Sequence, residues 1–153
     1  MPDLYIIFKF VHIAAAVAWI GGGLALTLLI GQVRGNGTGE EMAALLTRVE
    51  RFRKTYFAPL SVLVLVMGVD MAMIGGIMGA PWVSIGFLGI FVSAGIGMGY
   101  LTPKSRQLRT LIEQHGLTHP EVAQLGNQLL LVSRIDSVIL MLIVAVMVFK
   151  PGA

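Results

Sequence analysis

Four long stretches of apolar residues run through this 153-residue chain and limit the folds it can adopt. They cover residues 4–30, 57–78, 82–101 and 129–149. A helix needs about 20 apolar residues to cross the ~30 Å hydrocarbon core of a bilayer, and each stretch provides them. Hydrophobic residues make up 56% of the chain and charged residues only 12%, which leaves too few polar residues to cover a soluble protein. The sequence therefore predicts an all-α integral membrane four-helix bundle, formed as a single domain over residues 1–153.

The basic residues predict how this bundle is oriented. Eight of the eleven lysines and arginines lie between the first and second stretches or between the third and fourth, and a ninth lies near the start of the fourth: Arg34, Arg48, Arg51, Arg53, Lys54, Lys104, Arg106, Arg109 and Arg134. Short loops rich in Lys and Arg stay in the cytoplasm. We therefore expect both termini outside the cytoplasm, in the plasma (inner) membrane of a bacterium. The basic segments should contact anionic lipid at the cytoplasmic face.

The two basic segments also carry signals for helix starts. Residues 31–39 are rich in glycine, which predicts a flexible loop. Thr38 with Glu41, and Thr118 with Glu121, have the spacing of a capping box, in which a Thr begins a helix and a Glu three residues later bonds back to it. The sequence thus predicts cytoplasmic helices starting at both sites, the second continuing through the fourth stretch.

Nineteen glycines are present, many of them inside the apolar stretches. Gly86 and Gly89, with Gly95, Gly97 and Gly99, belong to the third stretch. Small residues let helices approach closely in lipid, so the main expectation is tight helix packing. A bundle that holds a flat cofactor also needs positions without side chains, and the sequence does not separate the two uses.

Ionisable residues inside the apolar stretches are the candidates for function, because they cost energy in hydrocarbon. His12 lies eight residues from Leu4, ~12 Å along a helix at ~1.5 Å per residue. Lys9 and Trp19 share its helical face. Asp70 lies eight residues before the predicted end of the second stretch, at nearly the same depth. We therefore expect Lys9, His12 and Asp70 to converge.

Three arrangements of these residues remain open. Lys9 and Asp70 form a buried ion pair, or Asp70 accepts a hydrogen bond from one ring nitrogen of His12 and leaves the other for a metal or haem iron. In the third, Lys9 extends to the membrane interface. A histidine that only packs and hydrogen-bonds is the alternative to any ligand role.

Arg134 and Asp136, at the start of the fourth stretch, are assigned to structure. We expect Arg134 to reach the interface and Asp136 to pair with a basic residue of another helix. The chain has no cysteine, so thiol chemistry is excluded. No pattern of catalytic residues decides whether the protein is an enzyme.

Two segments resemble known membrane proteins. Residues 9–23 read KFVHIAAAVAWIGGG and residues 134–152 read RIDSVILMLIVAVMVFKPG. They resemble the first and last spans of a group of small bacterial four-span proteins, which includes HemJ-type protoporphyrinogen oxidases, CopD-type copper-resistance membrane domains and an uncharacterised branch. The HemJ-type resemblance implies a bundle that binds haem b through a first-span histidine, here His12. The arginine-rich stretch of the HemJ type and the further metal ligands of the CopD type are missing, so the uncharacterised branch is the most similar.

Two functions are therefore predicted as alternatives. In the first, the protein binds haem b in a redox or electron-transfer role, with His12 as the iron ligand. Asp70 then orients the histidine or balances charge, Trp19 shapes the pocket, and Lys9 is one candidate for the second ligand. In the second, the chain is a non-catalytic accessory subunit of a larger respiratory or photosynthetic complex. Lipid, a second copy or a larger membrane complex are the expected partners, and nucleic acid is not.

Overall fold

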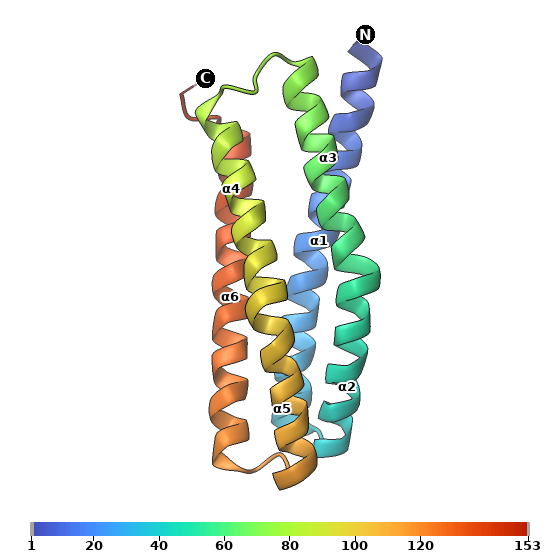
Figure 1. Ribbon diagram of the computed structural model, residues 1–153, viewed down its shortest axis with the longest axis vertical. Coiled ribbons are helices and arrows are strands. Elements are labelled where there is room, and N and C mark those ends of the chain that lie inside the picture. Colours follow the sequence, from blue (N-terminus) through green and yellow to red (C-terminus); the bar gives the residue numbers. More distant parts are fainter. Residues whose placement is uncertain (1, 153) are drawn as a thin grey trace.

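A computed structural model describes residues 2–152 as helices joined by short turns, with no strand among them (Figure 1). Four helices are long and apolar enough to cross a membrane, which confirms the predicted all-α membrane bundle. Two of them are continuous rods in which a short π-helical segment, labelled η, joins two α-helices. The elements are α1 (Pro2–Asn36), α2 (Gly39–Phe52), η1 (Arg53–Phe57), α3 (Ala58–Ile74), α4 (Pro81–Gly95), η2 (Ile96–Leu101), α5 (Thr102–His115) and α6 (Pro120–Phe149).

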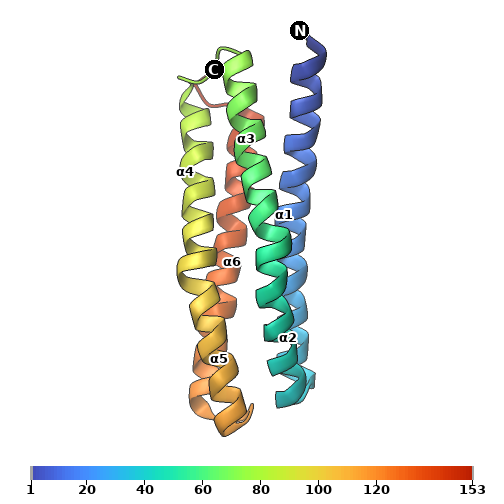
Figure 2. The same ribbon diagram turned by 45° about the vertical axis from the view of Figure 1, so that its right-hand side comes forward.

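The rods run up and down, so that the start of α1 and the end of α6 lie at the same end of the bundle (Figures 1 and 2). Helices α2 and α5 lie at the opposite end, which we call the α2–α5 end. Helix α1 packs mainly against α3, α4 against α6 and α2 against α5, whereas contact between α3 and α4 is sparse. The 35 residues of α1 span ~52 Å at ~1.5 Å per residue, well beyond a ~30 Å hydrocarbon core. Part of the bundle must therefore project from the bilayer.

The predicted flexible loop over residues 31–39 is wrong, because α1 continues to Asn36. Arg34 holds this extension against α6. Its guanidinium donates to Asn127 Oδ1 at 2.7 Å and to the carbonyl of Ala123 at 2.8 Å. Gly126 makes room for it, since a Cβ there would lie 3.2 Å from Arg34. These contacts come from a distant helix, and the local glycine content gave no sign of them.

Two other predicted boundaries also shift. The second stretch was expected to end at residue 78, but α3 ends at Ile74. Gly75 caps it and Gly76 adopts a positive φ of 65°, a backbone conformation that favours glycine. The capping box at Thr38 and Glu41 is confirmed. The second one is wrong, because His119 is the N-cap of α6, with its ring accepting from the backbone N–H of Glu121.

A compact apolar core fills the α2–α5 end. It combines residues of α2, η2, α5 and α6: Met42, Leu46, Leu101, Leu108, Ile112, Val122, Leu125 and Leu129. On its surface, Arg106 donates to Glu50 and lowers the pKa of that carboxyl below its usual value, so α2 and α5 are also joined by charge. By contrast, many large apolar side chains in the rest of the rods are exposed. Such faces suit contact with lipid chains.

Glycine packing in the third rod is confirmed at two positions. Gly86 and Gly89 are buried against α6. A Cβ at Gly86 would collide with the terminal methyl of Met147, and a Cβ at Gly89 would collide with the branched side chain of Ile143. A Cβ at Gly95 would meet nothing within 4 Å. The close approach of α4 and α6 therefore depends on Gly86 and Gly89 and not on every glycine of the stretch.

We expect Gly89→Ala to destabilise the protein by about 1–3 kcal/mol, because the stiff side chain of Ile143 cannot move aside without strain. Gly86→Ala should cost less, because the flexible end of Met147 can turn away. Gly95→Ala is the control and should be neutral or slightly stabilising. The measurement is the thermal unfolding midpoint in detergent. Equal midpoints for the Gly89 and Gly95 variants would contradict this packing.

Candidate functional site

His12 is fixed by a hydrogen bond to the backbone of α3. Its Nδ1 lies 2.8 Å from the carbonyl oxygen of Val64. A carbonyl can only accept, so Nδ1 carries the proton and donates. In the neutral ring the lone pair then sits on Nε2, for which the structure gives no hydrogen-bond partner within residues 2–152. His12 thus presents a free nitrogen lone pair in a held orientation.

The ring of His12 lies against Gly68. A Cβ at Gly68 would be 3.1 Å from His12 Cε1, so a larger residue would push the ring away. Neither Val64 nor Gly68 was singled out from the sequence. A backbone carbonyl can belong to any residue type, so the sequence could not identify Val64 as the acceptor. Gly68 did offer a signal, because a glycine at the depth of His12 can make room for the histidine ring.

The structure does not bring Lys9, His12 and Asp70 together by direct bonds. Lys9 is exposed and Asp70 partly buried, and no ion pair joins them within 4.0 Å across the described chain. Val64 takes the acceptor role that one of the three open arrangements gave to Asp70. Because successive residues turn by ~100° around a helix, Asp70 points away from the face on which Gly68 meets His12. The roles of Lys9 and Asp70 with a cofactor stay predictions.

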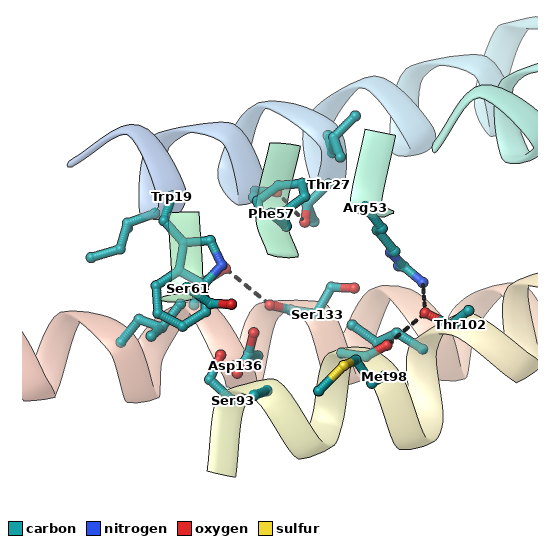
Figure 3. Close-up of a pocket in the computed structure, with 18 of the residues that line it drawn as sticks. Trp19, Thr27, Arg53, Phe57, Ser61, Ser93, Met98, Thr102, Ser133 and Asp136 are labelled. Carbon is teal, nitrogen blue, oxygen red and sulfur yellow. Dashed lines mark hydrogen bonds between the residues drawn. The ribbon is translucent and has the colours of Figure 1, made fainter. Parts of the chain in front are cut away.

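Trp19 lines a cavity between the rods, and His12 does not. Trp19 packs beside the small buried cluster of Ala15, Val64 and Ile90. The cavity has a volume of about 150 Å³ and takes residues from all four rods. It extends from Trp19 towards the α2–α5 end, where Arg53 and Thr102 lie (Figure 3). We call it the central cavity.

The central cavity is lined mostly by apolar residues but also contains several polar side chains. Its polar lining residues are Thr27, Arg53, Ser61, Ser93, Thr102, Ser133, Asp136 and Ser137. Asp136 Oδ1 is buried and has no hydrogen-bond partner. At the start of η1, Arg53 Nη1 donates to the hydroxyl of Thr102 at 3.3 Å. Arg53 and Asp136 thus line one cavity from different rods, and neither forms an ion pair within 4.0 Å in the part of the chain described.

Both π-helical segments border this cavity. Segment η1 begins with Arg53, and η2 contributes Gly97, Met98 and Leu101. The hydroxyl of Thr102 donates to the carbonyl of Gly97 at 2.8 Å and also accepts from Arg53, so it connects the two segments. Single π-helical turns within α-helices are often found at functional sites. Because two such segments border the same cavity, we interpret the central cavity as a functional site and not as a packing defect.

Sequence reasoning missed this cavity because it assigned its two charges elsewhere. Arg53 was counted only among the basic residues that set orientation. Asp136 was expected to pair with a basic residue of another helix, and it does not within the described residues. A signal was present: Ser133, Asp136 and Ser137 repeat at helical spacing within an apolar stretch, which places them on one face.

The available donors fit haem better than a bare metal ion. No group of three or more His, Asp or Glu side chains gathers to hold a metal within residues 2–152. A bare ion needs several protein ligands. In haem, the porphyrin supplies four nitrogen ligands to the iron, and the protein adds only one or two axial side chains. His12, held at Nδ1 with Nε2 free, has the form of such a ligand. The central cavity is too small for a porphyrin, since drug-sized ligands occupy about 300–1,000 Å³, so the two sites are separate.

Comparison with known proteins gives one match. The family described as "Predicted integral membrane protein (DUF2269)" matches residues 6–151, nearly the whole chain. No curated protein matches the sequence, and no solved structure matches the fold. The match supports a membrane protein, and it does not extend to the HemJ-type or CopD-type proteins.

Thr102→Val tests the connection between the π-helical segments. The valine keeps the shape but leaves the Arg53 guanidinium without its hydroxyl partner, which costs about 1–3 kcal/mol for a buried group, whereas the Gly97 carbonyl keeps the backbone N–H of residue 102. Thr110→Val, in the same helix, is the control. Its hydroxyl bonds to Arg106 in an exposed position, where water can replace it. We expect a lower unfolding midpoint for Thr102→Val than for Thr110→Val. Equal midpoints for the two variants would show that the Thr102 hydroxyl does not stabilise the fold.

Proposed function

We propose that this chain, which belongs to the family of predicted integral membrane proteins (DUF2269), binds haem b through Nε2 of His12 and serves in membrane electron transfer. The hydrogen bond from His12 Nδ1 to the Val64 carbonyl is the observation that carries the proposal. Histidines that ligate metals almost always donate their other ring N–H to a carboxylate, a backbone carbonyl or water, which fixes the tautomer and the ring orientation.

The position of His12 strengthens the proposal. The histidine lies in an apolar stretch that must cross the membrane, where an ionisable side chain is costly unless it has a use. Bound haem iron supplies one-electron chemistry. The protein's part is to hold the iron by Nε2 and to keep the ring fixed. Lys9, three residues before His12 on α1, shares its face, and Asp70 remains available to balance charge.

The haem proposal predicts a Soret band in protein purified from haem-supplied cells. His12→Ala should abolish or shift this band, and Gly68→Leu should weaken it by displacing the ring. His119→Ala is the control, because His119 caps α6 at the other end of the bundle and should leave the spectrum unchanged. Absence of the band in the wild-type protein, or a His12→Ala spectrum identical to it, would refute the proposal.

Purification in mild detergent separates the proposal from its alternative. A haem-containing monomer or homodimer supports a redox protein that acts through its own cofactor. A haem-free chain that co-purifies in fixed proportion with other membrane polypeptides instead supports an accessory subunit of a respiratory or photosynthetic complex. Exposed apolar side chains on every rod suit lipid and protein neighbours equally, so this measurement is needed.

We also propose that the α2–α5 end lies in the cytoplasm, against anionic lipid, and that both termini lie outside. The support is the concentration of basic residues at that end and the positive-inside rule. Alkaline phosphatase fused after residue 153 should be active in a bacterial inner membrane, and fused within residues 115–119 it should be inactive. Green fluorescent protein at the same sites should give the opposite pattern, and a reversed result would overturn the orientation.

A further inference from the structure

We infer that the central cavity is a binding site for a small zwitterion that carries one carboxylate and one ammonium group. Arg53 takes the carboxylate and Asp136 the ammonium. This site is separate from His12, which does not line the cavity, so it stands whether or not the protein binds haem.

The first argument is that opposite charges face the cavity without pairing. Arg53 bonds only to the neutral hydroxyl of Thr102, and Asp136 Oδ1 has no hydrogen-bond partner. Glu50 attracts Arg53 through space, and Ser93 hydrogen-bonds the Asp136 carboxyl, but neither Arg53 nor Asp136 contacts an opposite charge within residues 2–152. A charge without such a contact is costly within a membrane protein, and two opposite charges would remove this cost by meeting. They line one space and remain more than 4.0 Å apart. A molecule with the reverse arrangement of charges would satisfy both of them.

The second argument is the set of hydroxyl groups that line the same cavity as Asp136. Thr27, Ser61 and Ser137 each donate their proton to a carbonyl of their own helix, at Gly23, Ala58 and Ser133. Their oxygens therefore offer only lone pairs to the cavity. Together with the carboxylate of Asp136, they create surroundings rich in acceptors. Such surroundings suit the three N–H donors of an ammonium group.

The third argument is the size of the space. A cavity of about 150 Å³ is comparable to an engineered cavity that accepts benzene, which corresponds to about six heavy atoms. Small amino acids have this size. Gly97 and Ala94 line the space, and a Cβ at Gly97 would meet nothing within 4 Å. Met98 lines it while 71% exposed, so the cavity reaches the surface of the bundle and is not sealed.

Three matched probes test the charge pattern. Alanine carries both groups, propionate lacks the ammonium, and ethylamine lacks the carboxylate. Binding to the folded protein raises its unfolding midpoint with rising ligand concentration. We expect alanine, or one of glycine, β-alanine and 4-aminobutanoate, to give a saturable rise, and propionate and ethylamine to bind at least tenfold more weakly. No rise with any of the four zwitterions would mean that the cavity holds water only, and equal binding of ethylamine would make it a cation site.

Variants then assign each charge. Asp136→Asn and Arg53→Gln should each weaken binding of the best zwitterion at least tenfold, as measured by titration calorimetry in nanodiscs. Arg134→Gln and Arg51→Gln are the controls, since each is exposed and lies two residues from the tested position on the same rod. Binding that survives Arg53→Gln would overturn the zwitterion assignment.

A last variant removes the space and keeps both charges. The new side chain of Gly97→Leu enters open volume, so the protein should fold while binding is lost. This variant tests whether the zwitterion binds in the central cavity even where Asp136→Asn fails to fold. The same titration in the His12→Ala protein should give unchanged affinity, which separates this inference from the haem proposal. Binding that persists in Gly97→Leu would show that the zwitterion binds elsewhere.

Discussion

The hydrocarbon of a bilayer offers no hydrogen bonds to peptide groups, and the architecture of this protein follows from that constraint. A chain that crosses such a medium must satisfy its backbone internally, so each apolar stretch becomes an uninterrupted helix. Here the helices extend well beyond the membrane, up to 35 residues in α1. The extra length builds the apolar core at the α2–α5 end. That core buries side chains from water, a driving force that lipid-exposed faces lack.

Within the bilayer the rods must associate by other means. Gly86 and Gly89 let α4 approach α6, and Arg34 fastens the extension of α1 to α6. Gly22 accepts the ring of Tyr56, whose hydroxyl donates to the carbonyl of Ala18 at 2.9 Å. These contacts fix the rods in pairs and at their ends. The sparse contact between α3 and α4 leaves the middle open, and this is where the central cavity lies.

The sequence predicted the number of rods, their helical nature and the Thr38 capping box, because these depend on local composition and spacing. It missed features that depend on distant partners. The loop expected at residues 31–39 is helix because of Arg34, and the carbonyl acceptor of His12 belongs to Val64, 52 residues away. The expected meeting of His12 and Asp70 rested on depth alone. Depth fixes height along the bundle but not the side of the helix that a residue faces.

The His12 site and the central cavity differ in how much they cost the stability of the bundle. His12 offers one nitrogen and is held by a backbone carbonyl, an arrangement that the protein can maintain at little cost. Arg53 and Asp136 are charges kept apart across a cavity, which is costly to maintain. Two π-helical segments, themselves less stable than α-helix, meet at that cavity through Thr102. Packing and topology alone require neither the separated charges nor the π-helical turns. A ligand that interacts with both charges gives a reason for these features to occur together.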